Sequence, residues 1–95
     1  MIEVTVCSVT QIADALGSRK LYMELPEESD VLGLLHRLAD QYGEVFRELL
    51  FSNGEFKNGH TIILLNGRNI FAYDGLYRRL CEGDEILLMP AVSGG

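Results

Sequence analysis

The stretch DVLGLLHRLADQYG, residues 30–43, decides how the rest of the chain is interpreted. Asp30 stands where an N-cap residue is expected, and Gly43 stands at the C′ position. Between them, apolar residues recur at the three- and four-residue spacing of a helix with one buried face. They are Val31, Leu34, Leu35, Leu38, Ala39 and Tyr42. The stretch predicts one main amphipathic helix that needs an apolar sheet against its buried face, although Gly33 within it has no evident role.

Short apolar runs on both sides of this helix predict the strands of that sheet. Ile2, Val4 and Val6 alternate with polar residues, which indicates a strand with one face in the core. The run TIILL, residues 61–65, lacks such alternation, so we expect it to be buried on both faces. The strands are expected at residues 2–9, 20–25, 61–65, 69–72 and 85–89, with Pro26 and Pro90 ending two of them.

Glycines and polar clusters mark the connections between these elements. A short helix is expected at 10–17, closed by Gly17, and a further helical piece at 44–51. Loops or turns are expected at 52–59, at Asn66-Gly67 and at 81–84.

The resulting order is strand, strand, helix, strand, short strand, strand. It predicts an α+β domain with a mixed sheet of four or five strands and one main helix across one face. This order is that of the β-grasp, or ubiquitin-like, folds, in which the first and last strands are neighbours in the middle of the sheet. We expect residues 1–90 to form the domain and residues 91–95 to form a flexible tail ending in Gly-Gly.

Composition narrows the classes of function. The chain has 95 residues and a net charge of −6, and its densest basic pair is Arg78-Arg79, so we expect no nucleic-acid partner. The start lacks the basic region of a signal peptide, and no apolar run approaches the roughly 20 residues that span a bilayer. We therefore expect a cytoplasmic location and no membrane partner.

The ionisable and nucleophilic side chains form no recognisable catalytic motif. His36 and His60 have no obvious partner, and no phosphate-cradling loop is present, so we expect no catalytic residues and no bound cofactor. The serines lie outside any nucleophile elbow; they are Ser8, Ser18, Ser29, Ser52 and Ser93.

The two cysteines, Cys7 and Cys81, match no zinc or iron–sulfur spacing, so no metal is expected, and a β-grasp ferredoxin, which needs four cysteines, is excluded. Cys81 is the better candidate for a reactive thiol because Arg78 and Arg79 precede it. The two cysteines could be spatial neighbours if the first strand meets the approach to the last, but a disulfide is not expected in a reducing cytoplasm.

The C-terminal tail is the one segment whose sequence suggests a reactive group. A Gly-Gly ending arises by chance in about 0.5–1% of chains at average to enriched glycine usage, so it points to a function. Glycine lacks a Cβ and can thread a narrow channel, and five extended residues reach about 16 Å from the domain. A partner enzyme could then adenylate the terminal carboxylate with ATP and convert it to a thiocarboxylate.

The ending GDEILLMPAVSGG, residues 83–95, resembles the ending of the small subunit of molybdopterin synthase, a ubiquitin-like sulfur carrier. The segments LLNGRNI (64–70), DALG (14–17) and LPEESDVLGLLHRLADQYG (25–43) are similar to the same family, and 46–59 resembles its longer members. The sequence departs from the family at Ala91, where a second proline is usual, and at Met89 and Cys7, where an aromatic residue is usual.

The resemblance implies a non-catalytic small subunit that carries sulfur in molybdenum or tungsten cofactor synthesis. Its partners would be an E1-like adenylating enzyme, which uses ATP, and the large subunit of molybdopterin synthase. Gly95 would be adenylated and thiocarboxylated, and Gly94, Ser93 and Val92 would thread the partner's channel. The partner-binding residues would be Met89, Cys7, Asn69 and Pro90.

Two other interpretations of the sequence stay open. The chain could carry sulfur for thiamine or tRNA thiolation, or be a ubiquitin-like modifier joined to lysines. It could also be a β-grasp interaction module without tail chemistry.

Overall fold

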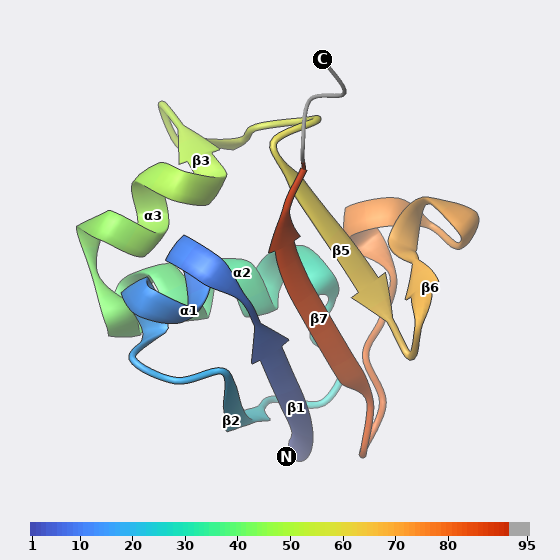
Figure 1. Ribbon diagram of the computed structural model, residues 1–95. Helices are drawn as coiled ribbons and strands as arrows, with labels where there is room; N and C mark the ends of the chain where they lie inside the picture. The colour runs from blue at the N-terminus through green and yellow to red at the C-terminus, as the bar shows by residue number, and fades with distance from the viewer. Residues whose placement is uncertain (92–95) are drawn as a thin grey trace.

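The centre of the fold is the pairing of the first strand with the last (Figure 1). The computed structural model describes residues 1–91. In it, β1 runs parallel to β7, from the pair Thr5–Glu85 to the pair Ser8–Leu88, and β7 is antiparallel to β5 on its other side. The five-stranded sheet has the order β2-β1-β7-β5-β6, which confirms the predicted mixed sheet and the central place of its first and last strands.

The strands and helices follow the expected order. The strands of the main sheet are β1 (Ile2–Ser8), β2 (Lys20–Leu25), β5 (Thr61–Leu65), β6 (Arg68–Asn69) and β7 (Glu85–Pro90). A small separate hairpin consists of β3 (Phe51–Ser52) and β4 (Glu55–Phe56). The helices are α1 (Thr10–Leu16), α2 (Val31–Tyr42) and α3 (Glu44–Leu50), with 3-10 turns at Ile70–Ala72 and Gly75–Tyr77.

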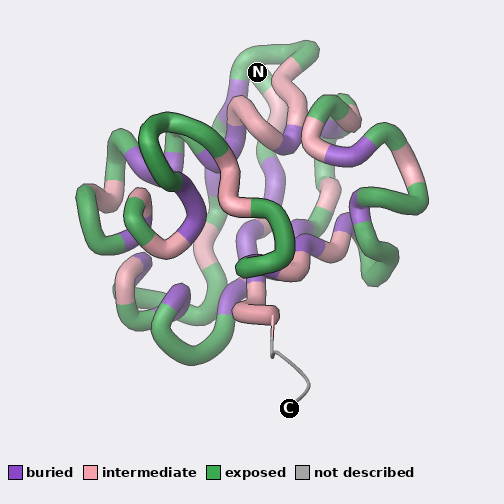
Figure 2. The backbone as a smooth tube through the Cα atoms, turned by 90° about the horizontal axis from the view of Figure 1, so that it is seen from above, coloured by how far each residue is buried: buried purple, intermediate pink, exposed green. Residues whose placement is uncertain are grey.

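The core lies between the sheet and the helices, as the buried stretches of the tube in Figure 2 show. The predicted stripe of α2 is buried from Val31 to Ala39, and it meets the alternate strand residues that face the same way. On β5, however, only Thr61, Ile63 and Leu65 are buried, while Ile62 and Leu64 are half-buried. The expectation that this strand is buried on both faces is therefore wrong: its second face belongs to a side of the sheet that the helices do not cover.

The caps of α2 are those expected from the sequence, and they explain Gly33. The Asp30 carboxylate accepts a hydrogen bond from the Gly33 N–H at 2.7 Å. A Cβ on residue 33 would lie 3.2 Å from that carboxylate oxygen, which is closer than most side chains approach. Glycine thus leaves room for a short cap. At the other end, Gly43 has φ 99°, a conformation that favours glycine.

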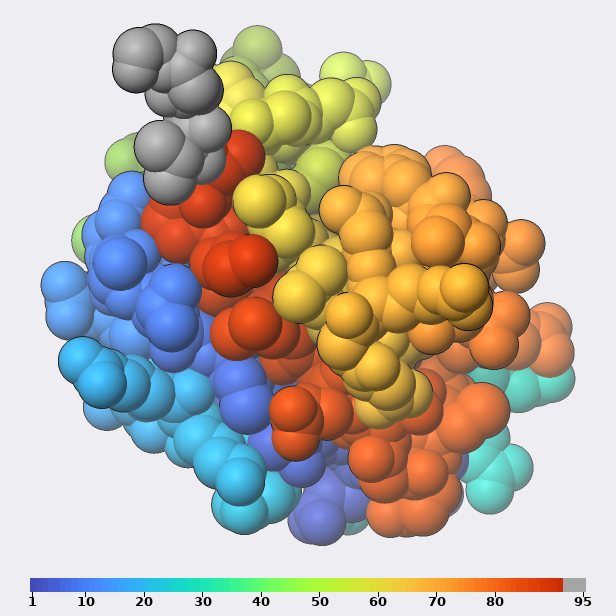
Figure 3. All heavy atoms as spheres, turned by 45° about the vertical axis from the view of Figure 1, so that its right-hand side comes forward, coloured from blue at the N-terminus to red at the C-terminus, as the bar shows by residue number. Residues whose placement is uncertain are grey.

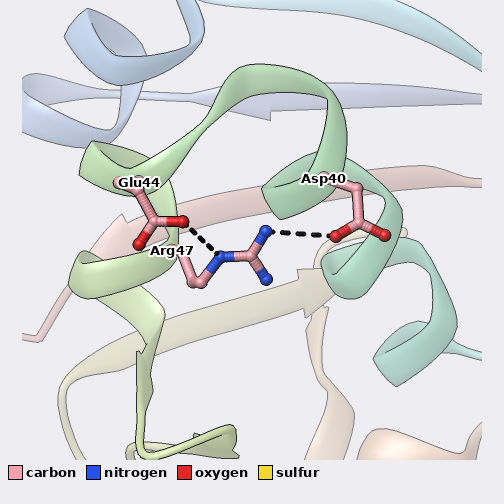
Figure 4. A network of polar contacts seen from close by, with 3 residues as sticks. All are labelled: Asp40, Glu44 and Arg47. Atoms are coloured by element: carbon pink, nitrogen blue, oxygen red, sulfur yellow. Dashed lines mark hydrogen bonds and ion pairs between the residues drawn. The ribbon is translucent and has the colours of Figure 1, made fainter.

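Arg47 ties α3 to α2 (Figure 4). Its guanidinium donates to Asp40 at the end of α2 and to Glu44 at the start of α3, both at 3.1 Å. These two hydrogen bonds to carboxylates raise the pKa of Arg47 above its ordinary value. The contacts join α3 to α2, and Leu49 of α3 lines a hollow next to Pro90 and Ala91.

Two connections differ from the expectation. The predicted strand at 69–72 is only β6, because the Asn69 side chain accepts a hydrogen bond from the Phe71 N–H at 3.0 Å and starts a 3-10 turn. The predicted loop at 52–59 contains the β3–β4 hairpin, whose turn residues Asn53 and Gly54 both have positive φ. Within residues 1–91, no helix is long and apolar enough to cross a bilayer.

Candidate functional site

The strand that precedes the tail, β7, lies in the middle of the sheet. Ile86 and Leu88 on β7 are fully buried. Pro90 is still paired with Thr61, and the Ala91 N–H donates to the His60 carbonyl at 3.1 Å. The backbone thus keeps its sheet pairing to the last described residue. The predicted activation residue Gly95 and the predicted threading residues Gly94, Ser93 and Val92 lie outside the described residues.

A polar cluster fixes the other end of β7. The Asn66 side chain accepts from the Glu85 N–H at 2.9 Å and donates to Asp84 at 3.0 Å. Asp84 in turn accepts from the Cys81 N–H at 2.7 Å. The Asn66-Gly67 turn and the turn before β7 are therefore joined, which sets the register of the strand that carries the tail.

The face of the sheet away from the helices carries an apolar patch beside the tail. Strand register places Cys7, Leu87 and Leu64 in one row across three strands, with Asn69 at its end. Met89 and Ile62 form the next row towards the tail. All of these residues are half-buried except Asn69, which is exposed. Figure 3 shows β7, in red, at the surface between the blue N-terminal segment and the yellow β5.

The structure thus brings three of the predicted partner-binding residues, Cys7, Asn69 and Met89, onto one face. It adds Ile62, Leu64 and Leu87, which the sequence analysis missed. On β7, the alternation of Leu87 and Met89 with buried neighbours could have shown that both face away from the core. The sequence of β5 gave no such signal, because it is apolar at successive positions. The oxygen of Asn69 already accepts from the Phe71 N–H.

The two cysteines differ in their surroundings. Burial raises the pKa of the Cys7 thiol, the Glu85 carboxylate raises it further, and Lys20 only partly opposes them. Cys7 therefore stays protonated at neutral pH and behaves as a small apolar side chain of the patch. Cys81 is exposed, and both are free thiols.

The two arginines that precede Cys81 contact other side chains. Arg78 lies 4.8 Å from the centre of the Tyr73 ring, and Arg79 pairs with Glu28 at 3.5 Å. Both guanidinium groups are thus engaged elsewhere.

Two hollows flank the root of the tail and meet at Gln11 and Pro90. One, of about 460 Å³, is lined by Gln11, Leu49, Lys57, Gly59, His60, Pro90 and Ala91. The other, also of about 460 Å³, is lined by Val9, Thr10, Gln11, Met89 and Pro90. The predicted partner-binding residue Pro90 thus stands between them. His60 belongs to this region, whereas His36 stacks on Phe51 with ring centres 4.7 Å apart and lies on α2.

The fold and the site define a ubiquitin-like protein with an apolar patch beside the end of its last strand. A model of the ThiS family matches residues 9–95, and the chain belongs to this family of ubiquitin-like sulfur carriers and modifiers. Small archaeal modifier protein 3 of Haloferax volcanii is 29% identical over 82 residues, covering 86% of this chain and 87% of that protein.

Solved structures agree with this assignment. The solution structure of small archaeal modifier protein 1 from Methanosarcina acetivorans is similar with a TM-score of 0.83 and 34% identity, covering 100% of this chain and 98% of that one. A putative molybdopterin converting factor, subunit 1, from Pyrococcus furiosus gives a TM-score of 0.78 and 26% identity, covering 97% and 100%. The predicted β-grasp fold is confirmed.

Proposed function

We propose that the protein is the sulfur-carrying small subunit of a molybdopterin synthase, acting in molybdenum or tungsten cofactor synthesis. The observation that carries the proposal is where β7 ends: Ala91 follows this central strand, and Pro90 lines a hollow together with Met89 of the apolar patch. A partner that holds the patch also fixes where the tail begins. The likeness to the Pyrococcus furiosus protein named as a molybdopterin converting factor subunit supports the choice of pathway.

In this proposal the chain supplies a carboxylate and the partner supplies the chemistry. The Gly95 carboxylate attacks the α-phosphate of ATP in an E1-like enzyme, and pyrophosphate leaves. Sulfide then displaces AMP from the acyl adenylate and leaves a thiocarboxylate. If the sulfur comes from a persulfide of the partner, the displacement of AMP gives an acyl disulfide, and a second thiol of the partner releases the thiocarboxylate by forming a disulfide with the thiol that carried the persulfide. The body of this protein binds and orients, with the apolar patch formed by Cys7, Ile62, Leu64, Leu87 and Met89 as the proposed contact surface.

Gly94, Ser93 and Val92 are the proposed threading residues, because small side chains let the tail enter a narrow channel. The same tail, once thiocarboxylated, would enter the large subunit and give its sulfur to the pterin precursor. No cofactor is proposed for this chain itself, since ATP is used by the partner.

Intact-mass measurement tests the carrier chemistry. Incubation with ATP, the E1-like enzyme and a sulfur source should add about 16 Da, the exchange of one oxygen for sulfur. A variant lacking Gly95 is the control and should show no gain. A mass gain that survives this deletion would place the sulfur elsewhere and end the tail mechanism.

The pathway needs a second assay. The thiocarboxylated protein is mixed with the molybdopterin synthase large subunit and the pterin precursor, and dithiolene formation is followed. Conversion with stoichiometric loss of the thiocarboxylate supports the proposal. A mixture that stays inert, together with loss of tRNA thiolation or thiamine synthesis in a deletion strain, would assign the sulfur to another product.

A second candidate function is protein modification, in which the activated tail forms an amide with a lysine of a target. It is favoured by two relatives that are named small archaeal modifier proteins. Denaturing blots of a strain expressing a tagged protein distinguish it: covalent conjugates that need Gly95 support modification, and their absence supports sulfur transfer alone.

A further inference from the structure

The two hollows at the root of the tail differ in chemical character, and this difference indicates how a partner is oriented. This inference rests on the function proposed above. We propose that Lys57 and His60, which line one hollow, bind carboxylates at the rim of the activating enzyme's channel. The hollow lined by Val9 and Met89 would receive an apolar side chain from the opposite side of the same rim. The two hollows share Gln11 and Pro90, and together they are called the collar.

The Lys57 and His60 side of the collar is held by backbone hydrogen bonds. The Lys57 N–H donates to the Leu50 carbonyl at 2.8 Å, and the His60 N–H donates to the Lys57 carbonyl at 3.4 Å. His60 in turn holds Ala91 through its own carbonyl. The two basic residues are therefore fixed relative to the start of the tail, and any contact they make with a partner is made at the tail's exit.

Charge gives this hollow its preferred partner. The chain has 14 aspartates and glutamates against 8 lysines and arginines, yet the ionisable side chains that line this hollow are Lys57 and His60. Over residues 1–91, neither side chain takes part in an ion pair or a side-chain hydrogen bond. An ammonium group and an imidazole N–H, half-buried and exposed respectively, are suited to carboxylates of a second protein.

The apolar side of the collar is continuous with the apolar patch on the sheet. Met89 belongs to both, and Val9 stands directly after β1. A partner that covers the patch with apolar side chains therefore contacts Met89 on one side of Pro90. The same partner can contact Lys57 on the other side of Pro90. This arrangement of one apolar and one cationic side gives a single orientation for docking, whereas an apolar patch alone would leave the partner free to rotate.

The length of the tail fixes where the acidic rim must lie. Four residues follow Ala91, and at about 3.3–3.6 Å each they span at most about 14 Å. The carboxylates of the rim should therefore lie within about 14 Å of the bound α-phosphate of ATP.

Charge reversal at Lys57 tests this inference in the full-length protein. The variants are Lys57→Glu and, as a matched control, Arg37→Glu, which makes the same change on the exposed part of α2 beside Asp40 and Gln41. ATP–pyrophosphate exchange with the E1-like enzyme gives KM for the carrier and kcat. Lys57→Glu should raise KM about 5- to 10-fold with kcat unchanged, because charges at the edge of an interface act mainly on association. The KM difference should shrink in about 0.5 M salt.

The outcomes separate the inference from the function on which it rests. If the wild-type protein supports no exchange, the proposed function fails and the docking inference fails with it. If the wild-type protein is active but Lys57→Glu and Arg37→Glu have the same KM, the carrier function stands and the acidic rim is refuted. A lower KM for Lys57→Glu would also refute it, since a partner surface that prefers a glutamate at position 57 is not acidic there. Urea unfolding midpoints equal to that of the wild-type protein show that the variants are folded.

Discussion

Replacing Asn66 by alanine removes the side chain that joins the end of β5 to the start of β7. Two hydrogen bonds are lost, one from the Glu85 N–H at 2.9 Å and one to Asp84 at 3.0 Å. Both are exposed, so each contributes near the low end of about 0.5–1.5 kcal/mol. Residue 66 also has φ 51°, and alanine in this left-handed conformation costs about 1 kcal/mol. The Asn66→Ala variant should therefore lose about 2–3 kcal/mol of unfolding free energy.

Asn66→Gly separates the two contributions. Glycine loses the same hydrogen bonds but adopts the left-handed conformation freely, so this variant should lose only about 1–2 kcal/mol. Urea denaturation at equilibrium measures both, with unchanged m-values showing that the change is in stability alone. An alanine variant within about 0.5 kcal/mol of the wild-type protein, or a glycine variant at least as destabilised as the alanine one, would refute this account of the turn.

Three further predictions concern caps, ion pairs and the patch. Asp30→Ala should cost about 1 kcal/mol in urea denaturation, because it removes the cap on the Gly33 N–H; no loss would mean that this cap does not stabilise α2. Arg47→Ala should speed hydrogen exchange of the α3 amides while leaving the sheet amides unchanged, and equal rates in α3 would contradict its role as a tie. Because burial raises the pKa of Cys7, its alkylation in a Cys81→Ser variant should have a pH midpoint above that of a free thiol. A midpoint at or below the free-thiol value would contradict this.

Local signals were sufficient to predict α2. Its stripe, its N-cap Asp30 and its terminal Gly43 lie within one short segment, and each acts on its own neighbours. The central pairing of β1 with β7 was also predictable, but only through the order of elements that the β-grasp folds share. The β3–β4 hairpin was missed although Asn53-Gly54 is a strong hairpin turn signal, because strands of two residues leave little alternation to detect.

Predicting the residues of the site would have required the pairing of strands that are far apart in the sequence, and only the structure shows this pairing. In β5, the residues TIILL are apolar on both faces, and it is pairing with β7 that places Ile62 and Leu64 beside Met89 and Leu87. Lys57 comes to the root of the tail for the same reason, since Thr61 pairs with Pro90 and brings the preceding loop alongside. Register between distant strands is set by the whole core, so neither feature has a local signature.

The central claim of the proposed function is that the reactive group of this protein is the carboxylate of Gly95, which a partner enzyme activates. The most direct test compares the protein with a semisynthetic form whose Gly95 carries a C-terminal amide, in ATP–pyrophosphate exchange with the E1-like enzyme. The account predicts exchange with the free acid and none with the amide, while both forms keep the same unfolding midpoint. Equal exchange with the amidated protein would contradict it.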